Sequence, residues 1–220
     1  MLEENLKTIS AEAEKHQAVL VAVSKTKSMD EILQVYDKGI RHFGENYADE
    51  LVAKHIRLPD DIFWHFIGHL QSNKAKLIAP FVYLIHSVDS IRLLNELEKQ
   101  GSKYNRVIKC LLQVHIAKEE SKFGIKPEKL MDFIHESLKT KRRHVLIDGL
   151  MGMATLTGDE QSIRNEFRQL KLLFEEAKKL LPQISILSMG MTSDYTIALE
   201  EGSTMIRIGS AIFGERNSGT

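Results

Sequence analysis

The residue with the clearest chemical potential is Lys25, which directly follows the apolar run 19–24 (VLVAVS). A lysine at the end of a buried strand is partly removed from water, which disfavours the charged form of its amine. A neutral lysine amine attacks carbonyl groups and forms a Schiff base. The same place also suits an ordinary solvated lysine, and Lys27 lies two residues further on. Taken alone, Lys25 leaves both interpretations open.

Two segments near the end of the chain combine glycine with serine: Ser188-Met189-Gly190 and Gly209-Ser210. Glycine lets the backbone approach an anion closely, and hydroxyl and backbone N–H groups donate hydrogen bonds to it. A single such segment indicates no more than a turn. Two segments after neighbouring strands, with Lys25 on the first strand, favour a ligand that carries a phosphate.

Arg207 is the penultimate residue of another apolar run, TMIRI. A guanidinium stays charged, so a buried one needs an acceptor, which can be a structural carboxylate or a ligand's ring nitrogen.

His65 alternates with aromatic residues and is expected in the core, whereas His69 is better placed to reach a site. The nine histidines and one cysteine show no zinc-site spacing, and no nucleophile-elbow or P-loop motif is present.

These residues need elements that bring them to one place, and the chain alternates short apolar runs with segments of helical period. The eight runs that we predict as strands are 19–24, 42–46, 63–68, 83–88, 107–116, 145–151, 184–190 and 204–208. The segments that we predict as helices are 1–17, 29–38, 48–57, 91–100, 127–140, 160–181 and 195–201.

Eight strands alternating with helices predict an α/β fold, a (β/α)8 barrel of the TIM type. We expect a single domain over residues 1–220, in which 18–214 form the barrel and the additional N-terminal helix 1–17 covers the gap left after the last strand. Chemistry in such barrels lies at the carboxyl ends of the strands, where Lys25, Ser188 and Gly209 fall. An open doubly wound sheet is the alternative, although no strand is followed by a convincing dinucleotide fingerprint.

The amino-acid composition indicates which classes of partner the protein is expected to bind. Thirty basic residues balance thirty acidic ones, so the overall charge does not suggest a nucleic-acid binder, and a small molecule is the expected partner. No window is long and apolar enough to span a membrane, and no secretion signal opens the chain. Cys110 is the only cysteine and lies in an apolar run, where a buried free thiol is expected. A cytoplasmic location fits best.

The segments that carry these residues resemble the pyridoxal 5′-phosphate homeostasis protein family, the YggS/PROSC group, whose fold is similar to the barrel domain of alanine racemase. The matching stretches run through nearly the whole chain in one order: AVSKTK (22–27), FGENY (43–47), WHFIGHLQSNK (64–74), HSVD (86–89), ESKFG (120–124), DGLMGMA (148–154) and LSMGMTSDYTIALEEGSTMIRIGSAIFG (187–214).

The resemblance implies pyridoxal 5′-phosphate (PLP) as the cofactor and assigns a role to each matching position. Lys25 becomes the Schiff-base lysine, and Arg207 faces the pyridine nitrogen. Other positions near the cofactor are Asn46 at the ring hydroxyl, Ser188, Gly209 and Ser210 at the phosphate, Met189 beside them, Ile67 and Gly68 in the pocket wall, and Lys122 as a weaker candidate.

The resemblance further implies a protein that holds PLP and takes part in vitamin B6 homeostasis and amino-acid balance, without efficient catalysis. A cation opposite the ring nitrogen keeps the ring a poor electron sink. In the related racemases an additional domain and a partner subunit supply one acid/base group, and we expect neither here.

We expect a monomer that hands PLP to apo forms of PLP-dependent enzymes. The alternative is a slow amino-acid racemase using Tyr47 or His69; a cofactor-free aldolase would leave the phosphate segments unexplained.

Overall fold

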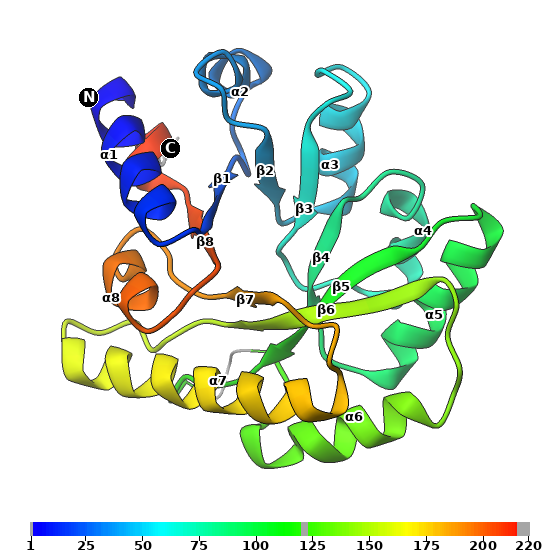
Figure 1. Cartoon of the computed structure of the whole chain (residues 1–220). Coiled ribbons are helices and arrows are strands. Elements are labelled where there is room, and N and C mark those ends of the chain that lie inside the picture. Colours follow the sequence, from blue (N-terminus) through cyan, green and yellow to red (C-terminus); the bar gives the residue numbers. More distant parts are fainter. Residues whose placement is uncertain (1, 120–122, 215–220) are drawn as a thin grey trace.

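Eight parallel strands close on themselves in chain order, so that β8 pairs with β1 (Figure 1). The computed structural model describes residues 2–119 and 123–214. The strands are β1 (Val19–Val23), β2 (His42–Glu45), β3 (Phe63–Phe66), β4 (Leu84–Val88), β5 (Ile108–Val114), β6 (Val145–Gly152), β7 (Ile186–Ser188) and β8 (Met205–Ile208). This confirms the predicted (β/α)8 barrel.

Helices connect the strands on the outside of the barrel (Figure 1). Their bounds are α1 (Leu2–Lys15), α2 (Met29–Tyr36), α3 (Ala48–His55), η1 (Ser72–Lys74), α4 (Ala75–Ile78), α5 (Ile91–Lys103), η2 (Pro127–Lys129), α6 (Leu130–Leu138), α7 (Glu160–Leu180), α8 (Tyr195–Glu200) and α9 (Ser210–Phe213). The sequence predicted most of these helices, but not η1, α4 and α9.

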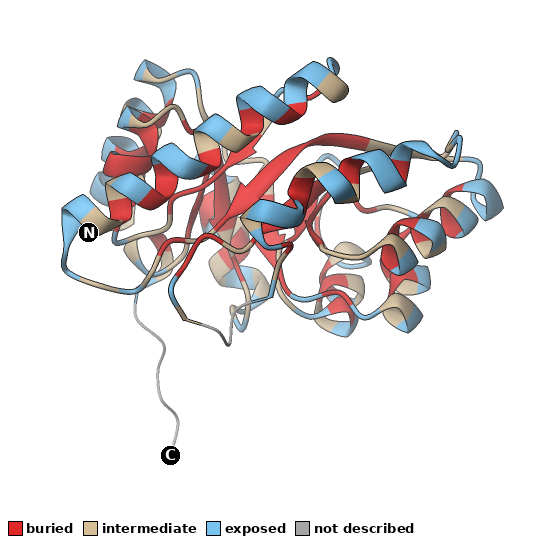
Figure 2. Ribbon diagram, turned by 90° about the horizontal axis from the view of Figure 1, so that it is seen from below, coloured by how far each residue is buried: buried red, intermediate tan, exposed pale blue. Residues whose placement is uncertain are grey.

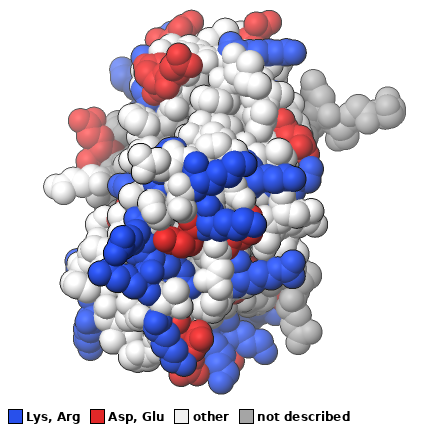
Figure 3. Space-filling view, turned by 90° about the vertical axis from the view of Figure 1, so that its right-hand side faces the viewer, with Lys and Arg blue, Asp and Glu red and all other residues white. Residues whose placement is uncertain are grey.

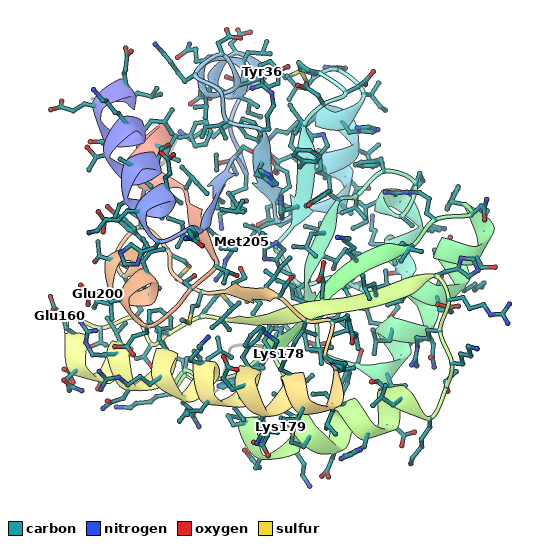
Figure 4. All side chains as sticks on the ribbon, viewed as in Figure 1. Tyr36, Glu160, Lys178, Lys179, Glu200 and Met205 are labelled. Atoms are coloured by element: carbon teal, nitrogen blue, oxygen red, sulfur yellow. The ribbon has the colours of Figure 1, made fainter. Side chains whose placement is uncertain are left out.

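Local sequence explains where the helices begin. Ser28 accepts a hydrogen bond from the Glu31 backbone and returns one to its carboxylate, a capping box that starts α2. Asp159 caps α7, the longest helix, which has Glu160 in its first turn and Lys178 in its last, as the macrodipole favours (Figure 4).

The side chains of the strands form two separate apolar cores, since successive residues of a strand face opposite sides of the sheet. One set faces the helices and forms the main core, visible as the buried strands and inner helix faces of Figure 2. The other set faces the barrel interior, where a smaller apolar cluster consists of Val21, Leu84, Leu111, Met151 and Met205. In β1 the interior positions are Val19, Val21 and Val23, so the next one in this series is Lys25.

The predicted N-terminal helix is present as α1, which packs beside α9 next to the β1–β8 seam (Figure 1). Leu6, Ile9 and Ala13 are its buried residues. The Asn5 side-chain amide donates a hydrogen bond of 2.9 Å to the carbonyl of Ala211. The first helix therefore covers the barrel where the last strand closes it.

The surface charge is uneven although the net charge is zero. Lys and Arg side chains gather on the face that lies at the right of Figure 1, with fewer Asp and Glu among them (Figure 3). Among the helices that the structure describes, none combines the length and hydropathy needed to cross a bilayer.

Candidate functional site

A cavity of about 360 Å³ opens at the carboxyl ends of the strands and extends over the β1–β8 seam. Its lining comes from six strands or the loops that follow them: Val23, Lys25, Asn46, Ile67, Met153, Met191, Thr192, Ser193, Arg207, Gly209 and Ser210. The barrel thus joins residues that lie up to 187 positions apart in the sequence, since the lining includes both Val23 and Ser210.

Six of the residues predicted for the site lie together on this cavity: Lys25, Asn46, Ile67, Arg207, Gly209 and Ser210. Lys25 is half-buried, as expected for a lysine at the barrel mouth. A smaller cavity of about 190 Å³ adjoins it and shares Lys25, Gly209 and Ser210. Lys27 lines this smaller cavity and not the first one, and its ammonium donates to the carbonyl of Phe213 at 3.0 Å.

The structure does not bring Ser188 and Met189 to the cavity lining. Both are fully buried, and Met189 packs in the main core between strands and helices. Ser188 faces the barrel interior but lies deeper, in contact with Arg207. The sequence prediction took the last residues of the strand 184–190 together as one phosphate-binding segment, whereas strand alternation sends neighbours to opposite faces.

Sequence reasoning missed three residues on the same loop, Met191, Thr192 and Ser193, which line the cavity in place of Ser188 and Met189. The signal was available, because the matching stretch continues past Gly190 as MTSD. Gly190 has a φ of +99°, a left-handed conformation that reverses the chain here and carries the next residues over the mouth. Met153, which directly follows β6, also lines the cavity and was not predicted for the site.

Arg207 forms part of the cavity floor and is almost fully buried. Its guanidinium donates to the hydroxyl of Ser188 at 2.5 Å and to the carbonyl of Gly152 at 3.1 Å. Burial lowers the pKa of Arg207 to about 10, and the charge of Asp194 acts in the opposite direction. Arg207 therefore remains a cation at neutral pH.

A row of three histidines, which we name the histidine chain, continues from this arginine through the barrel interior. Ser188 Oγ lies 3.1 Å from His86 Nδ1, His86 Nε2 lies 2.9 Å from His65 Nδ1, and His65 Nε2 lies 2.9 Å from His42 Nδ1. His65 and His86 are fully buried, and burial holds the pKa of each well below its usual range. His65 is thus a hydrogen-bonded core histidine, one of the two interpretations of its sequence position.

Arg207 is held at the end of this chain by its hydrogen bonds to Ser188 and Gly152. A guanidinium only donates, so Ser188 accepts from Arg207. Burial keeps His65 and His86 neutral at pH 7, so each has one ring nitrogen that donates and one that accepts within the chain. Arg207 is thus oriented by an ordered polar interior.

The two residues considered as acid/base groups, Tyr47 and His69, line a different cavity of about 360 Å³ beside the first. Both side chains are exposed, and His69 stacks on Phe123 with ring centroids 3.8 Å apart. Gly68 also lines this second cavity. Asn46 borders both, so it separates these groups from Lys25.

The chemistry of the first cavity suits an anionic, hydrogen-bonding ligand. Asn46 Oδ1 is buried with no hydrogen-bond partner within the described part of the chain, so the cavity offers an acceptor that a ligand hydroxyl would satisfy. α9 begins at Ser210, and the amide N–H groups of Ile212 and Phe213 donate to the carbonyl of Gly209, so the amides of Ser210 and Ala211 precede the first hydrogen bonds of this turn and are the ones that a ligand can use. Lys25 and Arg207 add two basic side chains.

Three further sequence expectations concern other positions. Cys110 is fully buried, as predicted, and burial raises the pKa of its thiol to about 12. Lys122 lies outside the described residues. Within 2–119 and 123–214, no cluster of His, Cys, Asp and Glu has an arrangement that could hold a metal ion.

Comparison with known proteins shows the family of the chain. The family described as "Alanine racemase, N-terminal domain" matches residues 1–217. A pyridoxal phosphate homeostasis protein of Pasteurella multocida is 40% identical over 205 residues, which cover 90% of this chain and 86% of that protein. The human pyridoxal phosphate homeostasis protein is 40% identical over 216 residues, which cover 91% of this chain and 78% of that protein.

Solved structures of other proteins are similar to this chain as well. PipY of Synechococcus elongatus, solved with PLP bound, superposes with a TM-score of 0.88 at 34% identity and covers 97% of this chain and 100% of its own. Alanine racemase of Streptomyces lavendulae superposes with a TM-score of 0.79 at 13% identity, covering 97% of this chain and 56% of its own. The racemase likeness concerns the fold alone.

Proposed function

Because the chain belongs to the alanine racemase N-terminal domain family, and its relatives near 40% identity are named pyridoxal phosphate homeostasis proteins, we propose that it binds PLP and takes part in PLP homeostasis. In this role the protein holds the cofactor in the cell and releases it to apo-enzymes. PLP supplies an aldehyde that condenses with primary amines and a phosphate that anchors it.

The observation that carries this proposal is the composition of the first cavity. One space of about 360 Å³ combines the half-buried amine of Lys25, the buried cation of Arg207, the unpartnered Asn46 Oδ1 and the first turn of α9. Such a set provides a partner for each polar part of PLP: the aldehyde, the ring nitrogen, the ring hydroxyl and the phosphate.

We assign the residues to PLP as follows. Lys25 holds the aldehyde as a Schiff base, Arg207 faces the ring nitrogen, and Asn46 accepts from the ring hydroxyl. Gly209 and Ser210 bind the phosphate at the start of α9. Thr192 and Ser193 offer further hydroxyls, and Ile67 supplies an apolar wall.

Ser188 and Met189 take indirect roles in this proposal. Ser188 accepts from Arg207 and so fixes the direction of the guanidinium. Met189 packs against the helices and stabilises the strand that leads into the loop. Neither needs to touch the cofactor.

Storage rather than efficient catalysis follows from the same groups. Arg207 stays protonated at neutral pH, so the ring nitrogen beside it is not expected to take a proton, and the ring withdraws electrons weakly. Proton transfer at a bound amino acid needs groups within hydrogen-bond reach on each face. Tyr47 and His69 instead line the neighbouring cavity.

The decisive experiment reduces the PLP complex with borohydride and maps the modified lysine by mass spectrometry. We expect the label on Lys25, its loss in Lys25→Ala, and its retention in the matched variant Lys27→Ala, which changes a lysine of the adjoining cavity. A wild-type protein that takes up no PLP, or a label that persists in Lys25→Ala, would contradict the proposal.

A second measurement separates the carrier from a racemase. The PLP complex is mixed with apo forms of PLP-dependent enzymes, whose recovered activity reports transfer, and separately with single-enantiomer amino acids. We expect transfer without appreciable racemisation. Multiple turnovers at substrate-like amino-acid concentrations would instead favour the slow racemase.

A further inference from the structure

Lys25 lies in a tight turn, residues 24–27, which we name the strand-one turn. The backbone N–H of Lys27 donates to the carbonyl of Ser24 at 3.0 Å, which closes the turn. Thr26 occupies its third position with a φ of +64°. Turns of this kind need a positive φ at the third position and usually have glycine there.

A threonine in this conformation is strained, because its β-branched side chain crowds the backbone when φ is positive. Such a residue persists only where surrounding contacts impose it. The contact here is strong: the backbone N–H of Thr26 donates to Oε1 of Glu50 at 2.6 Å. The carboxylate thus holds the peptide group immediately after Lys25.

The carboxylate belongs to a cluster of Glu45, Glu50 and Lys54, which we name the clamp. The Lys54 ammonium donates to Glu45 Oε1 at 2.8 Å, to Glu50 Oε1 at 2.7 Å and to the carbonyl of Ser24 at 2.8 Å. Ser24 Oγ also donates to Glu45 Oε1 at 2.6 Å. Each of these hydrogen bonds joins a member of the clamp either to the strand-one turn or to another member of the clamp.

The clamp lies behind the barrel wall and not in the cavity. Glu45 alternates with the interior positions of β2, and Lys54 and Glu50 are four residues apart on α3. Glu45 and Lys54 are almost fully buried, and none of the three lines the cavity that contains Lys25. None of the three therefore contacts a ligand in that cavity directly, and the hydrogen bonds that tie Glu50 and Lys54 to the neighbourhood of Lys25 end on the turn.

We propose that Glu50 and Lys54 are positioning residues that hold the strained strand-one turn and thereby aim the Lys25 amine into the cavity. The inference rests on the proposed function, since it assumes that Lys25 bonds to PLP. Lys54 fixes the carbonyl before Lys25 and Glu50 fixes the N–H after it, so together they restrict both peptide groups that flank the lysine.

The test compares PLP with 4′-deoxypyridoxine 5′-phosphate, which keeps the ring and phosphate but has no aldehyde for the lysine. In Glu50→Ala the turn relaxes and Lys25 spends less time in the competent orientation, so the dissociation constant of PLP rises about tenfold while that of the analogue stays within about twofold. Lys54→Met should give the same pattern. Lys171→Met, which removes the lysine of another helical Lys–Glu pair on α7, should change neither constant.

A rescue variant sharpens the result. Glycine adopts a positive φ without strain, so Glu50→Ala combined with Thr26→Gly should recover most of the PLP affinity. If Lys54→Met does not fold because it leaves buried carboxylates uncompensated, Glu45→Gln/Lys54→Met removes both charges of the buried pair and takes its place.

The outcomes are distinct. Equal weakening of PLP and the analogue, or unchanged binding of both, would overturn the positioning role while leaving the proposed function intact. Failure of the wild-type protein to bind PLP would overturn both. Selective loss of PLP binding, restored by Thr26→Gly, is the result that the clamp requires.

Discussion

Gly68 illustrates how tightly the ends of β2 and β3 approach each other beside the candidate site. An added Cβ at this position would lie 2.2 Å from the backbone oxygen of Asn46, far inside any normal contact distance. Gly68 lies two residues after the end of β3, and Asn46 lies between the end of β2 and the start of α3. Relief of this contact would therefore have to move backbone that is attached to these elements. The absence of a side chain at residue 68 is thus what allows Asn46 to stand between the two cavities.

We expect Gly68→Ala to lower the free energy of unfolding by about 1–3 kcal/mol, the usual cost of overpacking, and to weaken PLP binding by displacing Asn46. Urea unfolding and PLP titration measure the two effects. Gly158→Ala is the control, because nothing lies within 4 Å of its added Cβ, and it should shift stability by less than about 0.5 kcal/mol. Equal effects of the two substitutions would show that the contact at Gly68 is relieved cheaply.

At the scale of elements, the sequence predicted what hydrophobic patterning controls. All eight strands were found because each is a short apolar run bounded by turns, and α1 was found from Leu6 and Ile9 among charges. The segments η1, α4 and α9 were missed because helices of three or four residues show no complete period. The predicted strand 184–190 runs past the end of β7 at Ser188, since that end cannot be located from an apolar run that continues into glycine. Ser188 and Met189 were therefore both assigned to the cofactor, although only the residues after Gly190 reach the cavity.

The helix α1 should contribute to stability through its buried face. Leu6→Ala removes a side chain that is 4% exposed, and we expect a loss of about 2–5 kcal/mol in the free energy of unfolding. Glu14→Ala, on the exposed face of the same helix, should cost less than about 0.5 kcal/mol. Similar small effects of both variants in urea unfolding would mean that α1 adds little to the barrel.

At the scale of the whole molecule, the barrel interior combines a small apolar cluster with a polar chain that runs from His42 to Arg207. The sequence did not reveal this chain, because its members come from five strands and only the closed barrel brings them into line. The basic face in Figure 3 was hidden in the same way by a net charge of zero. Side-chain arrangements that arise only when the barrel closes cannot be predicted from the sequence of single segments.

Buried histidines make the stability of the protein sensitive to mild acid. The unfolded chain protonates histidine near pH 6.5, whereas burial lowers the pKa of His65 and His86 and keeps them neutral when folded. The free energy of unfolding should fall as pH drops below 6.5, by up to about 1.4 kcal/mol per pH unit for each histidine. Burial raises the pKa of Glu45 to about 7, which acts in the opposite direction between pH 7 and 4.5, but one carboxyl does not outweigh two histidines.

Urea unfolding at pH 7.5, 6 and 5 measures this dependence. The double variant His65→Gln/His86→Gln should show a shallower loss of stability across the same range, whatever its stability at pH 7.5. A wild-type protein that is equally stable at pH 7.5 and 5 would contradict the neutral, buried state of the histidine chain.

The seam between β1 and β8 has a consequence for biosynthesis. The ribosome completes β1 long before β8, although Val21 pairs with Arg207 and Asn5 bonds to Ala211 across 206 residues. Until then the strand VLVAV has an unpaired edge, the kind of segment that aggregates. The cavity is assembled from both sides of that seam, with Lys25 on one and Arg207 on the other. A nascent chain therefore gains its binding site only when the barrel closes, so any ligand of that site selects chains that have finished folding.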